Sequence, residues 1–463
     1  MGYNDFLDRK RISVLPSGFD PGDVGGGLYD FQRDLVRWAC RRGKAALFTM
    51  TGTGKTAMQL AWAEAVRAES GRPVLILAPL AVAQQTVREG KRMGIGVKHC
   101  RTGAGMGFGV NITNYEMLHA FSPDGLGGIV LDESSIIKAL DGKTRKDLIA
   151  FSRDIPYKLP CSATPSPNDY MELGNHAEFL GVMSHAEMLA TFFTHDGGET
   201  SKWRLKGHAE GKFWEWLASW SAFMVKPSDL GYSDDGFDLP PLNTYQHVVE
   251  SHVTEGTLFV LEARGLQERQ AARRESIDKR VEKCVEIVES GRVFEEQWVV
   301  WCDLNAEQDA LAKFFGKLGV SIYGSLSSDE KERRLDMWLN KEVPILITKP
   351  SIFGYGLNLQ QCHNTVFVGL SDSFESIFQA TRRFYRYGQT EPVDRHLIIS
   401  GAEGSVLSNI NRKEHEFMRM IGEMVSLTAG AVKRNIRSLV RESEAYTAET
   451  EMRIPAWLKS EKR

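Results

Sequence analysis

The stretch ALFTMTGTGKTAMQL, residues 46–60, joins a short apolar run to a helix-forming sequence through a turn that contains two glycines. The apolar run predicts a β-strand at Ala45–Phe48. The sequence that follows predicts a helix at about Lys55–Glu69, closed by Gly71. A strand, a tight turn and a helix in this order form the basic unit of parallel α/β proteins. This stretch therefore indicates the fold class.

The same alternation of short apolar runs and helical stretches fills the first 225 residues and resumes near residue 297. A chain of 463 residues exceeds what one core normally organises, so we predict two α/β lobes with parallel sheets. The predicted boundaries are 1–225 for the N-terminal lobe, 226–290 for a linker and small helical protrusion, 291–425 for the C-terminal lobe and 426–463 for a helical, polar tail. The further candidate strands are Val74–Ala78, Val110–Thr113, Ile129–Leu131, Lys158–Cys161, Trp298–Cys302, Ile345–Thr348, Thr365–Val368 and Arg395–Ile399, with a helix at Glu307–Leu318.

Composition excludes several classes of protein. The 42% hydrophobic and 25% charged residues are ordinary for a soluble globular chain, and no apolar stretch reaches the length of a membrane span. Six separated cysteines without a CxxC pair argue against a disulfide framework or a zinc site, and fit a reducing cytoplasm. The net charge of -3 gives no global nucleic-acid signature, so any polyanion must bind to a local face.

The glycine-rich turn has the composition of a phosphate-binding loop. Gly52 and Gly54, with Thr53 between them, allow a tight turn whose N–H groups point at a polyphosphate such as that of ATP. Lys55 supplies a positive charge, and Thr56 supplies a hydroxyl ligand for Mg²⁺. The strict pattern has glycine six residues before the lysine, where this chain has a threonine. A chance turn is the alternative, which the flanking strand and helix disfavour.

A second signal is GGIVLDESS, residues 127–135, in which an apolar run delivers two adjacent carboxylates. A phosphate loop needs a carboxylate on a neighbouring strand to hold Mg²⁺ through water, and hydrolysis needs a group that orients water. Asp132 is the candidate for the first role and Glu133 for the second. Taken alone, the pair is equally typical of a solvated acidic loop.

A third signal lies in the second half, in QATRRFYRYGQ, residues 379–389. Arg383 and Arg386 are three residues apart, hence on one face of a helix or turn. Guanidinium groups aimed across a cleft neutralise charge on a transferring phosphoryl group. The alternative is a solvated basic helix. The segment SATP, residues 162–165, follows another apolar strand and offers hydroxyls that can bond the acidic loop.

Together these segments resemble superfamily two helicases, and within them the Swi/Snf-type DNA translocase branch. The resemblance covers about residues 28 to 425. It rests on LYDFQ (28–32), TGTGKT (51–56), LILAP (75–79), ITNYE (112–116), LDES (131–134), SATPSPNDYMELGNHAEFL (162–180), FMVKPSD (223–229), GYGLNLQ (354–360) and QATRRFYRYGQ. The short interlobe segment resembles compact bacterial or phage members.

The resemblance implies two RecA-like lobes that bind ATP and Mg²⁺ between them. Gln32 would recognise the adenine edge, and Gln379 would reach the nucleotide together with Arg383 and Arg386. Gly356 would shape the loop beneath it. DNA, duplex or branched, would be contacted mainly at its backbone and without sequence preference. The expected contact loops are Pro79–Gln84, Thr113–Tyr115, Lys138 and Gly324-Ser325. A partner from replication, recombination or transcription is compatible with this activity.

The chain departs from the family pattern at a few positions. Ser134 and Ser135 follow the acidic pair, where the family has Ala-His or Ala-Asp, which puts coupling of hydrolysis to DNA in question rather than hydrolysis itself. Pro350-Ser351 and Tyr385 replace other usual residues of the second lobe. The alternative to a translocase is therefore a nucleotide-gated clamp that binds DNA or a protein partner with weak or uncoupled ATPase activity.

The tryptophan-rich segment GKFWEWLASWSAFM, residues 211–224, allows stacking on bases or packing in a core. Its large apolar residues recur at helical spacing on one face, which favours a core. These residues are Phe213, Trp216, Leu217, Trp220 and Met224.

Overall fold

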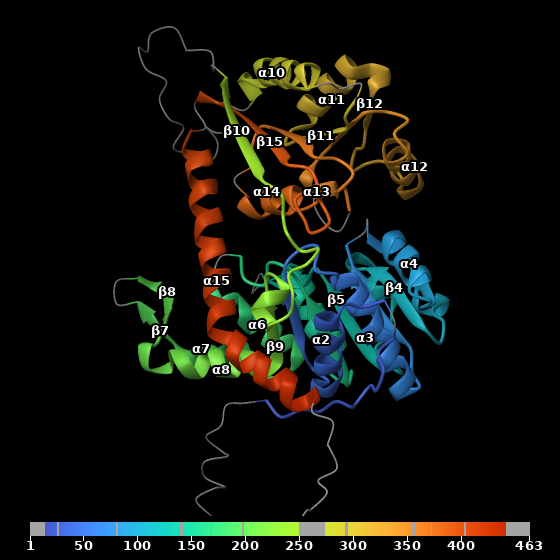
Figure 1. Ribbon diagram of the computed structural model, residues 1–463, viewed down its shortest axis with the longest axis vertical. Helices are drawn as coiled ribbons and strands as arrows, with labels where there is room; N and C mark the ends of the chain where they lie inside the picture. The colour runs from blue at the N-terminus through green and yellow to red at the C-terminus, as the bar shows by residue number, and fades with distance from the viewer. Residues whose placement is uncertain are drawn as a thin grey trace, which may run out of the picture.

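Two parallel β-sheets divide the chain into two lobes (Figure 1). The computed structural model describes residues 14–440 except 26, 80–81, 139–141, 168, 197–198, 250–273, 292–294, 354–357, 372 and 402–403. Within these residues each sheet is flanked by helices, as expected for a chain that alternates strands and helices. The predicted two-lobe α/β fold is confirmed at this level.

The first lobe contains a seven-stranded sheet in the order β3-β4-β2-β5-β6-β1-β9, and every pair of neighbours is parallel. Its strands are β1 (Ala46–Thr49), β2 (Val74–Ala78), β3 (Val97–His99), β4 (Val110–Asn114), β5 (Gly128–Asp132), β6 (Tyr157–Cys161) and β9 (Ser221–Met224). Its helices are α2 (Asp30–Arg42), α3 (Lys55–Ser70), α4 (Ala83–Arg92), α5 (Lys143–Ser152), α6 (Leu173–Leu180), α7 (His185–Phe192) and α8 (Glu210–Trp220). An antiparallel hairpin, β7 (Phe193–Asp196) and β8 (Glu199–Leu205), lies between α7 and α8 in the sequence.

The second lobe contains a six-stranded sheet in the order β10-β15-β14-β11-β13-β12, again with parallel neighbours. Its strands are β10 (Leu242–Val249), β11 (Trp298–Cys302), β12 (Gly319–Ser321), β13 (Ile345–Thr348), β14 (Asn364–Val368) and β15 (Val393–Ser400). Its helices are α10 (Ile277–Ser290), α11 (Asn305–Phe315), α12 (Ser328–Leu339), α13 (Pro350–Phe353) and α14 (Phe374–Thr381), followed by α15 (Gly404–Val440).

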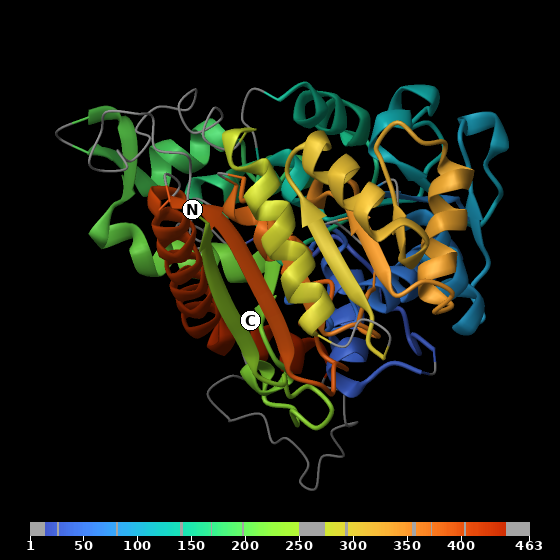
Figure 2. The same ribbon diagram turned by 90° about the horizontal axis from the view of Figure 1, so that it is seen from above.

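The structure differs from the expected boundaries at two places. The segment predicted as linker and protrusion contains β10, which pairs with β15 over its whole length, so this part of the linker completes the second sheet. The predicted boundary between residues 425 and 426 falls inside α15, a single helix of 37 residues. This helix begins beside β10 and continues to the first lobe, where it packs against α8, α2 and β9 (Figures 1 and 2).

The tryptophan-rich segment packs in the core, as predicted, but its end was assigned to the wrong element. Phe213, Trp216, Leu217 and Trp220 lie on α8 and are buried. The helix ends at Trp220, and Met224 is the last residue of β9, where it is buried too. Sequence analysis missed β9 because four residues after a helix carry little periodicity.

No helix in the part of the chain that the structure describes has both the length and the apolar character needed to cross a membrane.

One buried ion pair connects α10 to α11 in the second lobe. Arg280 Nη2 lies 2.6 Å from Glu307 Oε1, and both side chains are fully buried. Glu307 also accepts backbone N–H bonds from Asp303 and Leu304 at the start of α11. Removing one member of such a pair leaves an uncompensated charge in the interior.

We therefore expect Glu307→Gln to lower the free energy of unfolding by about 3–5 kcal/mol, because the Arg280–Glu307 ion pair is lost while the guanidinium stays buried. The glutamine oxygen can still accept the two N–H bonds. Urea denaturation followed by circular dichroism measures the change. The double variant Arg280→Met/Glu307→Gln should recover most of the loss, since neither charge remains. Equal losses in the single and double variants would contradict this explanation.

Candidate functional site

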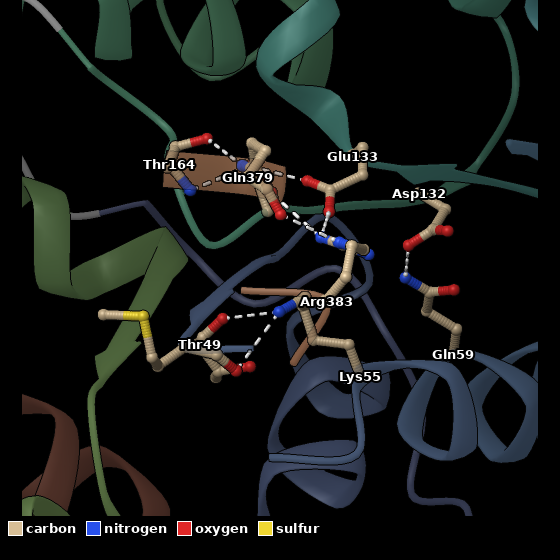
Figure 3. A network of polar contacts seen from close by, with 10 residues as sticks. Thr49, Lys55, Gln59, Asp132, Glu133, Thr164, Gln379 and Arg383 are labelled. Carbon is tan, nitrogen blue, oxygen red and sulfur yellow. Dashed lines mark hydrogen bonds and ion pairs between the residues drawn. The ribbon is translucent and has the colours of Figure 1, made fainter. Parts of the chain in front are cut away.

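The glycine-rich loop connects the end of β1 to the start of α3 and depends on its two glycines (Figure 3). Gly52 has φ +90° and Gly54 has φ +84°, conformations that side chains disfavour. A Cβ at position 54 would lie 2.2 Å from Gln32 Nε2. Lys55 Nζ donates to the carbonyl oxygens of Thr49 at 2.8 Å and of Met50 at 3.2 Å. The loop therefore curls around the ammonium group, which is oriented toward the loop's interior.

Gln32 fixes the loop from the side of α2. Its Nε2 donates to the Thr53 carbonyl at 2.8 Å, and its Oε1 accepts from the Tyr29 backbone N–H at 3.0 Å. Tyr29 is 58% exposed and packs edge-on against Phe237 of the interlobe segment, with ring centroids 5.0 Å apart. An exposed aromatic ring beside an anchored amide suits a flat heterocycle.

The acidic pair ends β5 directly opposite the loop's helix. Asp132 Oδ1 accepts from Gln59 Nε2 at 2.8 Å, and Gln59 lies one turn after Lys55 on α3. Glu133 has φ +53°, so the chain turns sharply between the two carboxylates. Burial and the neighbouring Glu133 raise the pKa of Asp132 to about 6. Burial lowers the pKa of Lys55 to about 8.

Side chains from the second lobe complete this group. Arg383 Nη2 lies 3.8 Å from Glu133 Oε1, and the Arg383 guanidinium also donates to the Gln379 backbone and side-chain oxygens at 3.0 Å. Gln379 Nε2 donates to Thr164 Oγ1 at 3.0 Å. Ser162 Oγ donates to Glu133 Oε2 at 3.5 Å. The predicted SATP segment and the arginine segment therefore meet at Glu133 (Figure 3).

The remaining predicted residues lie near this network or outside the described residues. Thr56 is half-buried in the first turn of α3. Arg386 is half-buried, and among the described residues its Nε finds no hydrogen-bond partner. Burial lowers the pKa of Arg386 to about 10. Gly356 lies outside the described residues, so its expected role in shaping the loop stays a prediction.

A cleft of about 1580 Å³ opens between the lobes beside Glu133. It exceeds the usual volume of a small-molecule pocket. The loops predicted to contact DNA meet here, since its lining includes Pro79, Gln84, Thr113, Tyr115, Lys138 and Gly324. Ser325 is not among the lining residues. The first lobe also contributes Arg88, Arg92, His99 and Arg101, whereas the second contributes Asp329, Glu332, Asp336 and Glu375 with Lys331.

The two serines after the acidic pair face different surroundings. Ser134 is fully buried, and its Oγ lies 3.0 Å from His176 Nε2 on α6. Burial lowers the pKa of His176 to about 3, so the imidazole is neutral at neutral pH. Ser135 lines the interlobe cleft. The contact between the acidic loop and the SATP segment runs through Glu133 and Ser162 rather than through Ser135.

Four residues that shape the site were not predicted from the sequence. They are Gln59, His176, Glu375 and Tyr387. Tyr387 follows the second arginine, its hydroxyl donates to the Val225 carbonyl at 2.8 Å, and its backbone N lies 2.5 Å from where a Cβ of Gly52 would be. Gln59 was detectable from its i, i+4 spacing to Lys55. The others depend on contacts between distant segments.

The donor set fits a polyphosphate better than a directly liganded metal. Lys55, Arg383 and Arg386 converge beside the glycine-rich loop, and the hydroxyl of Thr51 is buried there without a hydrogen-bond partner among the described residues. Among all the residues that the structure describes, no group of three His, Cys, Asp or Glu side chains could hold a metal ion. Mg²⁺ is usually held by one or two protein ligands together with phosphate and water, so Thr56 and Asp132 remain compatible with it.

No protein-family model matches this chain, and a comparison with curated proteins gives no match either.

The Ser134–His176 contact generates a prediction about stability. Ser134→Ala leaves the Nε2 of a buried neutral imidazole without its partner, which we expect to cost about 1–3 kcal/mol of unfolding free energy. Urea denaturation measures this cost. Ser135→Ala, one residue along and facing the cleft, is the matched control and should cost less. A larger loss for Ser135→Ala would mean that the His176 bond is not the important contact of this segment.

Proposed function

We propose that this chain is an ATP-dependent DNA translocase of the Swi/Snf-type branch of superfamily two helicases, with two RecA-like lobes. The observation that carries the proposal is the network in which Arg383 and Gln379 of the second lobe reach Glu133 and Thr164 of the first. This network lies beside a glycine-rich loop at a strand-to-helix junction. A site assembled from two lobes opens and closes with the nucleotide between them.

ATP would be held by the backbone N–H groups of the loop at Gly52, Thr53 and Gly54. Lys55 would exchange its loop carbonyl partners for phosphate oxygens, which are stronger acceptors because they are charged. Gln32 would contact the adenine edge, with Tyr29 beside the ring. Thr56 and Asp132 would hold Mg²⁺, which neutralises charge on the phosphates.

Hydrolysis requires that water be aimed at the terminal phosphoryl group and that the developing charge be offset. Glu133 is the group that would orient the water and accept its proton. Arg383, already directed at Glu133, and Arg386, whose Nε is buried without a partner among the described residues, would offset the charge. Because both arginines come from the second lobe, hydrolysis depends on how the lobes are placed.

Duplex or branched DNA is the proposed substrate along which the protein moves. Its backbone would be contacted in the interlobe cleft. The cations of the first-lobe wall support this assignment, since phosphate contacts give affinity without sequence preference. A protein that works on DNA would act in the cytoplasm of a bacterium or of a phage-infected host. A partner from replication, recombination or transcription would then direct where the motor loads.

We expect the wild-type protein to hydrolyse ATP and duplex, forked or single-stranded DNA to raise the rate. Lys55→Ala and Glu133→Gln should each lower the stimulated rate by about 100-fold or more, because one removes the phosphate charge and the other the water-orienting carboxylate. A phosphate-release assay measures the rates, and thermal melting shows that the variants are folded. A rate that no nucleic acid changes would contradict the translocase, and stimulation by RNA alone would contradict DNA as the substrate.

A second candidate is a nucleotide-gated clamp that binds DNA or a protein partner without processive motion. One observation favours it. Helix α15 packs on α14 of the second lobe and on α8 and α2 of the first, so a single rigid element connects both lobes. Such a connection restricts how far the lobes can separate during a cycle.

Displacement of a triplex-forming strand separates the two candidates. A translocase should release the third strand from duplex DNA in the presence of ATP, because movement along the backbone strips it, whereas Glu133→Gln should not. Gel electrophoresis with a labelled third strand provides the measurement. ATP hydrolysis and DNA binding without any release would identify the clamp.

A further inference from the structure

Helix α14 presents one face to three segments of the first lobe. Glu375, near its start, forms an ion pair with Lys138. Gln379, one turn later, donates to Thr164, and Arg383, just past the helix end, lies beside Glu133. The three side chains are four residues apart, which places them in a row along one face. One short element therefore contacts the expected nucleotide site at one end and Lys138 at the other.

The Lys138–Glu375 pair stands at the interlobe cleft, where both residues contribute to the lining. The side chain of Lys138 is 34% exposed and that of Glu375 is 10% exposed. Asn175 Nδ2 donates to the Lys138 carbonyl at 2.8 Å and so holds the loop on α6. The backbone of the lysine is held in position, and its ammonium group is paired with a carboxylate of the opposite lobe while Glu172 of its own lobe acts on it as well.

A nucleic-acid phosphate in the cleft would therefore approach a lysine, Lys138, that is already paired with the Glu375 carboxylate. A phosphate that reaches Lys138 Nζ lies beside the Glu375 carboxylate, and two anions at that distance repel each other. Either Glu375 withdraws or the phosphate binds less tightly. The other acidic residues of the second-lobe wall, Asp329, Glu332 and Asp336 on α12, lie in the same cleft without a described contact to Lys138.

We propose that Glu375 is an internal competitor that occupies Lys138 and lowers the affinity of the cleft for nucleic acid until the pair is broken. This inference rests on the proposed function, because it assumes that the cleft binds a nucleic-acid backbone. It assigns to Glu375 a positioning role that no recognised motif gives it. Gln379 and Arg383, farther along the same helix face, keep their own contacts to Thr164 and Glu133 when the pair is broken.

Duplex affinity at fixed, low salt tests the proposal, measured by fluorescence anisotropy with a labelled duplex and without ATP. Glu375→Gln should tighten binding by about fivefold, a shift in the usual range for a single coupled charge. Asp336→Asn removes the same charge from the same cleft away from Lys138 and is the matched control, with an expected change under about twofold. In a Lys138→Met background, Glu375→Gln should have no further effect.

Equal tightening in Glu375→Gln and Asp336→Asn would overturn the proposal, because the effect would then be the general field of the cleft. Persistence of the Glu375→Gln effect without Lys138 would overturn it as well, and so would weaker or unchanged binding in Glu375→Gln, which indicates a purely structural ion pair. A wild-type protein that binds no nucleic acid refutes the proposed function itself. The two failures are therefore distinguishable.

Discussion

Two adjacent carboxylates, Asp132 and Glu133, are buried at the end of β5, and much of the site can be understood as compensation for them. Burying one charge is costly unless donors and cations surround it, and two like charges side by side add repulsion. Asp132 receives Gln59 from α3, and Glu133 receives Ser162 and the guanidinium of Arg383. The last of these comes from the other lobe. Within the first lobe Lys55 is a cation near both carboxylates, and the second lobe adds Arg383 at Glu133.

The two lobes meet at this site through several further contacts. Gln379 and Arg383 reach into the first lobe from α14, and Tyr387 continues the contact by donating to Val225 and approaching Gly52 so closely that no side chain would fit there. On the opposite side α15 closes the connection, with Asn435 bonded to the Ala218 carbonyl at the end of the core helix α8. The lobes are thus linked at the charged site and again through α15, so a relative movement of the lobes must change both sets of contacts.

Most strands of the fold, and the glycine-rich loop and acidic pair of the candidate site, could be predicted from local sequence patterns. The strands at Val74–Ala78, Trp298–Cys302 and Ile345–Thr348 were predicted to the residue, because buried parallel strands are continuous apolar runs. Strand β10 was not predicted, since an edge strand with exposed residues on both faces has no clear alternation. The residues of the glycine-rich loop and the acidic pair follow from turn and strand-end chemistry. Glu375 and His176 do not, because their partners lie 237 and 42 residues away in the sequence.

The two serines after the acidic pair, Ser134 and Ser135, have different surroundings. Ser134 turns inward to a neutral histidine, while Ser135 occupies the cleft wall without a charge. A charged contact to the second lobe lies at Lys138, three residues after Ser135, and its partner Glu375 precedes Arg383 by eight residues. The cleft lysine and the acidic pair are thus both contacted from α14 and the residues just past its end, with Glu375 at Lys138 and Arg383 at Glu133.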